Sequence, residues 1–508
     1  MSINKLLNRK IYRDKVYGCW TGKAAGGTLG GPYEWNRKMN SVTFYPPEIN
    51  GANLPNDDLD LQLVWLAAAE RYGALNVNER ILAEYWSEMI TGPWNEYGVC
   101  RNNIRMGIMP PLSGSCGNDQ WKWSNGAWIR SEIWACLFPG NPVRAAEAAY
   151  ADACCDHCGE GIYAEILTAA MESAAFLESD VMKLIDIGLS LIPSDSRIAS
   201  AVRIAIKCHA EGCSLAEARN AIMKEFEDLG WFQAPGNIAF AILGLLYGAG
   251  DFGKTIAYAV NCGDDADCTA GFAGALTGII LGKSGIPKQW TDPVGDSILT
   301  CSIENTGRTW VKPVPKTLKE LTDRVIDCAE GAAISARWLT QFTDGDSSGP
   351  ESCIPNEYQK RQFLYFLEHK SPYELTIDQP WGLISFDFEN GPFIQSGKPL
   401  RIKVRMRPFY SELMLVRVRL RLPEEWSSEQ DEIMLTSSRT SDCAELTVIP
   451  GPIKGAVTGL ETEIQRDDRI LPALAVLPLI RANSVAYTRC TVEMMEKQYA
   501  WMMQKAEE

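Results

Sequence analysis

Apolar residues recur along this chain with two different periods, and the change falls near residue 345. Up to about residue 340 they return every three or four positions, which is the spacing of helices with one buried face. Beyond the linker-like stretch TDGDSSGPESCIPNE the period becomes two, where Val416, Val418 and Leu420 alternate with arginines. The pattern predicts a mainly α fold: a helical domain over 1–345, a linker over 346–356, and a small antiparallel β-sandwich domain with a C-terminal helix over 357–508.

The alternating arginines give the predicted β domain a distinct outer face. If the aliphatic residues face the core, then Arg401, Arg417 and Arg419 face the other side of the sheet. We expect a strongly positive face, which is either the solvated side of the sheet or a surface lying against the more acidic helical domain. This segment has no pair of acids ahead of an apolar helix, so we expect it to support the first domain.

The most distinctive helical stretch is Asn261 to Gly282, NCGDDADCTAGFAGALTGIILG. Asp264, Asp265 and Asp267 precede a run of small and apolar residues that is too short to span a bilayer. Carboxylates clustered in an apolar setting are tolerable when protonated or neutralised, and Mg²⁺, Mn²⁺ or Ca²⁺ suit such oxygen ligands. The alternative is that these acids only complement the helix dipole.

A second helix has the same design. Pro55 and Asn56 form a helix start, and Asp57, Asp58 and Asp60 crowd the first turn. Alone, this pattern indicates an N-cap with acids that complement the dipole. Two acid-headed helices in one chain favour a site at which they converge, with the five or more carboxylates that a two-cation centre needs.

The glycine-rich segment Gly18 to Trp35 precedes both helices. It fails as a dinucleotide-binding fingerprint, because Ala25 stands where the first glycine is required. Close packing of a helix explains the glycines better, and the segment leaves Glu34 just beyond Pro32, where the helix stops.

Loops rich in tryptophan and a cysteine-rich turn follow. Trp121, Trp123 and Trp128 could stack on a sugar or base, or they could simply hold their loop in place. Cys154 to Cys158 offers half a zinc site that no second pair completes. His157 and Glu160 stand at the head of another small-residue helix, where they either line a cleft or serve the structure.

Composition excludes several classes of function. A net charge of −15 and a pI near 5.0 argue against a protein that binds phosphate backbones, so we expect no nucleic-acid partner. We find neither a secretory signal nor a membrane span, and we expect a cytoplasmic protein with no membrane partner. The 16 cysteines are scattered singly, as is typical of reduced buried thiols.

Five segments together resemble the ADP-ribosylglycohydrolase family in order and spacing. They are Gly18 to Glu34, Asn56 to Asp58, Asn125 to Arg130, Asp156 to Met171 and Asp264 to Gly282. The resemblance implies an all-α orthogonal helical bundle with two Mg²⁺ ions at the mouth of a cleft. It also implies hydrolysis at C1 of a ribose whose hydroxyls these ions hold.

The resemblance implies roles for single residues. Asp57 and Asp58 match the first metal-binding motif, and Asp265 and Asp267 match the second. Glu34 matches the family's N-terminal glutamate, and we assign catalysis to Glu34 and Asp265. The remaining implied metal ligands are Asn56 and Cys268, and the implied substrate contacts are Asn125, Gly126, Trp128, Arg130, His157 and Glu160.

Some positions depart from the family's pattern. Asn56 and Leu59 stand where threonines flank the first acid pair, and Cys268 follows the second pair. An amide oxygen can replace a hydroxyl as a ligand, whereas cysteine is a poor ligand for magnesium. The sequence therefore leaves the number and identity of the cations open, with Mn²⁺ or Ca²⁺ as alternatives to Mg²⁺.

Two other functions remain open at this point. One is a glycosidase for another small sugar conjugate or a nucleoside-like substrate, and the other is an inactive scaffold or sugar-binding protein. Retention of mutually repelling acids argues against an inactive site. The expected partner is a small sugar or ADP-ribosyl compound, and the sequence leaves the oligomeric state open.

Overall fold

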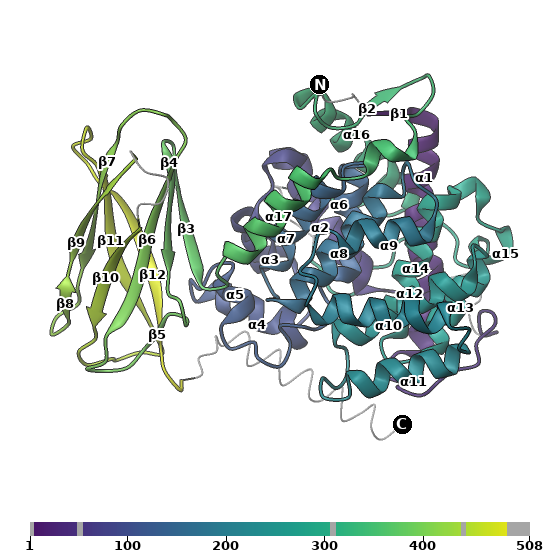
Figure 1. Cartoon of the computed structure of the whole chain (residues 1–508), viewed down its shortest axis with the longest axis horizontal. Helices are drawn as coiled ribbons and strands as arrows, with labels where there is room; N and C mark the ends of the chain where they lie inside the picture. The colour runs from purple at the N-terminus through teal and green to yellow at the C-terminus, as the bar shows by residue number, and fades with distance from the viewer. Residues whose placement is uncertain (1–4, 48–53, 305–310, 438–442, 485–508) are drawn as a thin grey trace. The chain divides into compact units, whose positions relative to one another are not determined.

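Helices fill the N-terminal part of the chain and strands fill the C-terminal part (Figure 1). The computed structural model describes residues 5–47, 54–304, 311–437 and 443–484. The mainly α fold with a following β-rich part is confirmed. The C-terminal helix, expected from about residue 491, lies outside the described residues.

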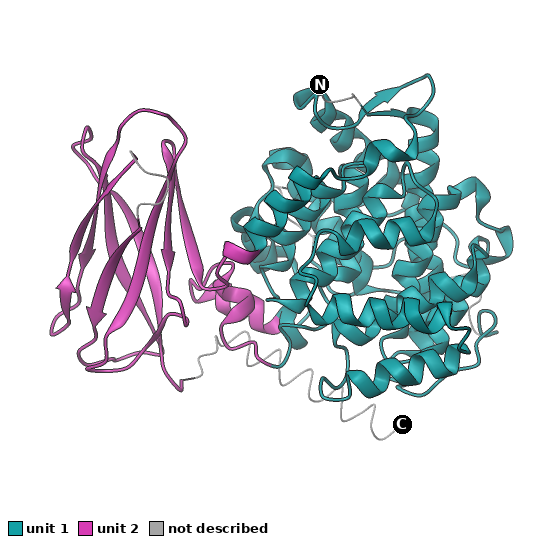
Figure 2. Ribbon diagram, viewed as in Figure 1, with its two compact units in different colours: residues 1–97, 120–367 teal, residues 98–119, 368–508 magenta. Residues whose placement is uncertain are grey.

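The chain divides into two units, which Figure 2 colours separately. Unit 1 contains residues 1–97 and 120–367, and unit 2 contains residues 98–119 and 368–508. By this division the stretch predicted as a linker, 346–356, lies within unit 1. Residues 98–119, which the sequence pattern assigned to the helical domain, join the β-rich unit instead.

Unit 1 is built almost entirely from helices. Its α-helices are α1 (Arg9–Gly30), α2 (Asp57–Tyr72), α3 (Glu79–Met89), the start of α4 (Asn95–Arg105), α6 (Glu132–Leu137), α7 (Pro142–Ala153), α8 (Glu160–Ala174), α9 (Val181–Leu189), α10 (Arg197–Ala210), α11 (Leu215–Glu225), α12 (Ala234–Gly248), α13 (Phe252–Asn261), α14 (Ala266–Leu281), α15 (Lys288–Thr291), α16 (Leu318–Ser335) and most of α17 (Glu357–His369). Short 3₁₀ turns include η1 (Gly31–Tyr33) and η3 (Trp128–Arg130), and β1 (Leu6–Asn8) pairs in parallel with β2 (Gln341–Thr343).

The centre of unit 1 is the antiparallel pair α1 and α14. A side chain at Gly18, Gly22, Gly26 or Gly30 would clash with backbone oxygens of α14, so only glycine permits this close approach. Because the end of α1 packs on the start of α14, residues just beyond Gly30 come next to the acids that open α14. None of the helices in the described ranges is both long and apolar enough to cross a membrane.

Unit 2 is a β-sandwich. One sheet has the order β3 (Glu374–Gln379), β4 (Gly382–Asp387), β6 (Leu400–Pro408), β10 (Cys443–Ile449), β8 (Ser427–Gln430). The other has the order β5 (Phe393–Ile394), β12 (Ala473–Arg481), β11 (Val457–Arg466), β7 (Leu415–Arg421), β9 (Glu432–Thr436). Both sheets share one core, to which Ile108 and Leu112, the first residue of α5 (Leu112–Ser115), also belong.

The arginine-rich face of this sandwich is not the strongly positive surface that the sequence predicted. The alternation itself is present, since Val416, Val418 and Leu420 are buried and the arginines between them are exposed. However, Arg405 on β6 pairs with Glu374 on β3 and Asp387 on β4 of the same sheet, and the other sheet carries similar pairs. The acids come from strands distant in sequence, so the local pattern could not reveal them.

Candidate active site

One side of the candidate site is the start of α2. Asn56 is the N-cap residue, and its side-chain oxygen accepts a hydrogen bond from the Asp58 N–H at 2.7 Å. The cap leaves Asp57 half-buried and Asp58 fully buried. Because the Asn56 oxygen serves the helix, its amide nitrogen faces Asp267, at 3.5 Å from Oδ2. A ligand role for Asn56 stays a prediction, because in this conformation its nitrogen, and not its oxygen, is the atom near Asp267.

The opposite side is the turn that opens α14. Asp264 has φ +65°, and its carboxylate accepts a hydrogen bond from Phe232 N and pairs with Arg37, both at just over 3 Å. These contacts hold the turn and direct Asp264 away from the other acids. Asp265 is the N-cap residue, and its Oδ2 accepts a hydrogen bond from the Asn125 amide at 2.6 Å.

Two carboxylate oxygens at this junction are buried without a hydrogen-bond partner. They are Asp265 Oδ1 and Asp267 Oδ1. An unsatisfied buried carboxylate oxygen is costly, so such atoms are typical of a site that binds a cation. The orphaned oxygens therefore fit the divalent cation expected from the sequence.

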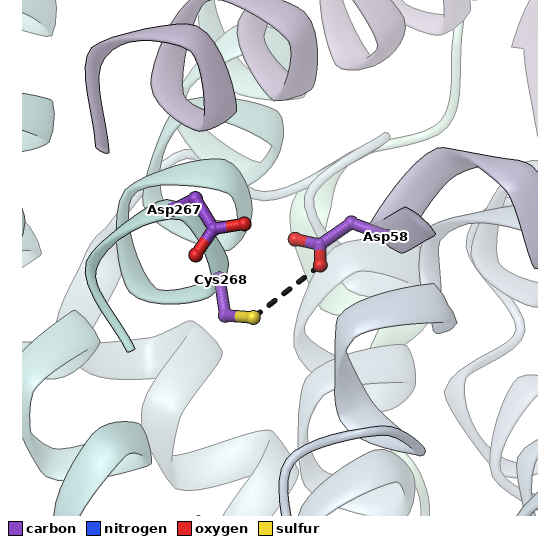
Figure 3. A group of neighbouring side chains, drawn as sticks. All are labelled: Asp58, Asp267 and Cys268. Atoms are coloured by element: carbon purple, nitrogen blue, oxygen red, sulfur yellow. Dashed lines mark hydrogen bonds between the residues drawn. The ribbon is translucent and has the colours of Figure 1, made fainter. Parts of the chain in front are cut away.

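Two sets of side chains bring ligand atoms within 4.8 Å of one another among the described residues. We call Glu34, Asp265 and Asp267 the carboxylate group, and Asp58, Asp267 and Cys268 the thiol group (Figure 3). In the thiol group the Cys268 thiol donates to Asp58 Oδ1 at 3.3 Å. Only the carboxylate group offers three hard oxygen ligands of the kind that Mg²⁺, Mn²⁺ and Ca²⁺ prefer.

The electrostatic setting of these acids is unfavourable without a cation. Burial and the neighbouring Glu34 charge raise the pKa of Asp265 well above its usual range. Burial, together with the charges of Asp265 and Asp58, also raises the pKa of Asp267 well above its usual range. Asp57 belongs to neither group, but burial and the Asp58 charge raise its pKa to about 6.

One basic residue, which the sequence analysis missed, lies beside the acids. Lys23 is only 2% exposed, and its Nζ lies 3.4 Å from Asp58 Oδ2 and 2.9 Å from Glu132 Oε1. Burial disfavours its charge, but Glu132 and Asp58 outweigh that effect and raise its pKa. The available signal was a single lysine within the small-residue segment Gly18 to Gly30.

The predicted substrate contacts Asn125 and Trp128 lie together next to the acids. The Trp128 ring nitrogen donates to Asn125 Oδ1 at 3.0 Å, while the Asn125 amide donates to Asp265. Trp128 is fully buried and its ring packs on Phe272. In this arrangement both side chains position Asp265, and their role as substrate contacts stays a prediction.

Arg130 and His157 belong to a separate buried charge cluster. The Arg130 guanidinium binds Asp156 through two hydrogen bonds of 2.7 and 2.9 Å and also binds Asp152 and the Gly126 carbonyl. His157 Nδ1 lies 2.8 Å from Asp156, and its Nε2 lies 3.2 Å from Ser124 Oγ. This Ser–His–Asp sequence of contacts is buried, and Ser124 donates to a backbone carbonyl, so it does not present a nucleophile.

The remaining predicted residues serve neighbouring helices. Both Glu160 oxygens accept hydrogen bonds from the first N–H groups of α10, at 2.9 and 3.0 Å. Gly126 leaves room for Glu96, which a side chain there would hit.

We expected Asp60 to join the acid cluster, and the structure shows that it does not. Its carboxylate accepts hydrogen bonds from the Cys301 and Ser302 N–H groups at 2.7 Å instead. Neither metal-capable group of the described residues contains Cys154 or Cys158.

An aromatic rim, also missed from the sequence, adjoins Glu34. Trp35 and Trp231 are 46% and 38% exposed, and their ring centroids lie 6.3 Å apart. Trp35 has φ +71° and Phe232 has φ +56°, conformations that are strained for large side chains and cluster at functional sites. Phe232 connects the rim to the turn that opens α14 through its hydrogen bond to Asp264.

Comparison with known proteins identifies the family of the part of the chain that holds this site. The family model for ADP-ribosylglycohydrolase matches residues 8–330, which contain every residue of both metal-capable groups. Over 84 residues the chain is 32% identical to ADP-ribosylarginine hydrolase Tri1 of Pseudomonas putida (strain GB-1), an alignment that covers 16% of this chain and 19% of that protein. The chain belongs to the ADP-ribosylglycohydrolase family.

Proposed function

We propose that this protein is a divalent-cation-dependent glycohydrolase that cleaves the glycosidic bond of an ADP-ribosyl or related ribosyl group. The observation that carries the proposal is the convergence of Glu34, Asp58, Asp265 and Asp267 with buried oxygens that lack hydrogen-bond partners. Membership of the ADP-ribosylglycohydrolase family supports the same reaction class.

The carboxylate group and the thiol group would hold up to two cations, with Mg²⁺ as the first candidate and Mn²⁺ or Ca²⁺ as alternatives. When bound, such cations hold sugar hydroxyls and lower the pKa of a water molecule. Asp265 and Asp267 would hold the carboxylate position, and Asp58 would contribute to the thiol position. The Asn125 amide fixes Asp265 Oδ2 and leaves Oδ1 for the cation.

Glu34 is suited to the proton transfer. It is half-buried while Asp58, Asp265 and Asp267 are buried, so among these acids it is the one with access to water. Cleavage of a glycosidic bond passes through an oxocarbenium-like state, which needs a fixed sugar and a water that can lose a proton. We assign acceptance of that proton to the Glu34 carboxylate.

The test is hydrolysis by the full chain of ADP-ribosyl-arginine and ADP-ribosyl-serine peptides, alongside aryl glycosides and nucleosides. We expect cleavage of an ADP-ribosyl substrate that stops with chelator and returns with Mg²⁺ or Mn²⁺. If only aryl glycosides or nucleosides are cleaved, the substrate is another sugar conjugate and not an ADP-ribosyl compound. Cation-independent cleavage would overturn the proposal.

A further inference from the structure

The two metal-capable groups share Asp267 but differ in charge and chemistry. The carboxylate group consists of three acids, whereas the thiol group replaces one acid by Cys268. A neutral thiol is a poor ligand for hard cations. The groups therefore offer different affinities even before their surroundings are considered.

A fixed positive charge lies against the thiol group. The Lys23 ammonium has three anchors, which are Asp58, Glu132 and the Ile129 carbonyl at 2.5 Å. Because Lys23 is buried in the middle of α1, its charge cannot turn into solvent when a cation approaches. No ion pair of the described residues joins Asp265 to a lysine, so the ammonium of Lys23 acts on the Asp58 side of the site.

The surroundings of Lys23 are built to hold it there. Gln62 donates to Glu132 Oε2 at 2.8 Å and to the Asp58 carbonyl at 3.0 Å, and its oxygen accepts from Ile133 N. A Cβ atom at Gly271 would come within 3.2 Å of Asp58 Oδ2 and would contact the end of Lys23. Hydrogen bonds and close packing thus fix the positions of Lys23 and Asp58 between α1, α2 and α6.

We propose that Lys23 is a built-in counter-charge for Asp58 that takes over part of the task of a second divalent cation. On this reading, which rests on the proposed function, the carboxylate group is the strong cation position and the thiol group binds a second cation weakly or not at all. Glu132 partly neutralises Lys23, so it moderates the repulsion between the ammonium and that second cation.

The test measures the number and affinity of bound Mg²⁺ and Mn²⁺ ions by titration calorimetry on the full chain. We expect one strong binding step for the parent protein. Lys23→Met should add a second step or tighten it at least tenfold, because the repulsive charge is gone. Glu132→Gln should weaken the second step, because the lysine charge is less neutralised.

The opposite signs separate electrostatics from damage to the fold, which would weaken binding in both variants. Lys15→Met is the matched control, since Lys15 lies on the same helix but donates to the Ala175 carbonyl, and its binding should equal that of the parent. If Lys23→Met does not fold, Lys23→Gln, which removes the charge but keeps a polar group beside Asp58 and Glu132, decides in its place.

Two equal steps in the parent, or a folded Lys23 variant that gains no second step, would overturn the role of Lys23. Failure of the parent to hydrolyse any ADP-ribosyl substrate, with these binding results intact, would refute the proposed function and leave the role of Lys23 standing.

Discussion

Two buried charged clusters in unit 1 differ in how their charges are balanced. Around Arg130, the guanidinium donates to Asp152, Asp156 and a backbone carbonyl, and Arg130 holds the pKa of Asp156 at about 2 although burial alone would raise it. Around Asp267, carboxylates face one another, and Asp265 Oδ1 and Asp267 Oδ1 have no hydrogen-bond partner. A buried acid that is paired with a cationic side chain, as Asp156 is, indicates a structural role, whereas buried acids that repel one another favour a bound ligand.

Glu34→Gln tests the functional side of this comparison and has the largest expected effect. Loss of a general acid or base lowers turnover by about 10²- to 10⁴-fold, so kcat should fall by that amount even at saturating cation, because the glutamine amide oxygen keeps a ligand atom but cannot take up the proton. Glu211→Gln, at an exposed position after α10, is the control and should keep parental kcat. Unchanged turnover in Glu34→Gln would remove this residue from the chemistry.

Arg130→Met tests the structural side. It leaves Asp152 and Asp156 buried without their cationic partner, which typically costs about 3–5 kcal/mol of unfolding free energy. Urea unfolding followed by circular dichroism would measure the loss. A normally stable variant that has lost only activity would show that this cluster also serves the reaction.

Cation binding should stabilise the parent protein by about 2.7 kcal/mol when the free cation is at a hundred times its dissociation constant. Asp265→Asn should abolish that gain and raise the melting temperature of the cation-free protein, because it relieves repulsion from Glu34. Asp228→Asn, an exposed acid paired with Arg197, should retain the full cation response. An unaltered response in Asp265→Asn would contradict the carboxylate group.

The two clusters should also respond to pH with opposite signs. The folded-state pKa of Asp57, about 6, lies above the unfolded value near 3.8, so Asp57 protonation favours the fold and stability falls as pH rises from about 4 to 6. Asp156, with a folded-state pKa of about 2, contributes stability above pH 4 that is lost as pH falls toward 2. Melting temperatures of the Asp57→Asn and Asp156→Asn variants, measured with chelator present across this pH range, would separate the contributions of the two residues.

The smallest effect is expected at the aromatic rim. If Trp35 stacks on a ring of the substrate, Trp35→Ala should lose about 0.5–1.5 kcal/mol, or roughly a three- to tenfold rise in KM. Trp338→Ala removes another exposed tryptophan and should leave KM unchanged. An unchanged KM in Trp35→Ala would restrict the substrate site to the acid cluster.

Local patterns in the sequence were sufficient to predict the two acid-headed helices, because N-caps and small-residue helices are encoded within a few positions. They were insufficient where a partner lies far along the chain. The ion pair of Lys23 with Glu132 and the hydrogen bond of Asn125 to Asp265 join distant segments, and only the folded chain shows that Asn125 positions an acid. The same limit explains why Asp60 and Asp264 looked equivalent to the acids that converge.

Unit 2 is assembled from two separate stretches of the chain, so its parts emerge from the ribosome at different times. Residues 98–119 leave the ribosome roughly 250 residues before the first residues of the remainder of their unit, which begins at 368. At about 5–20 residues per second, Ile108 and Leu112 wait for ten seconds or more before any strand of their shared core exists. During that interval the nascent chain exposes an apolar segment, and a chaperone that binds it would protect the growing chain from aggregation.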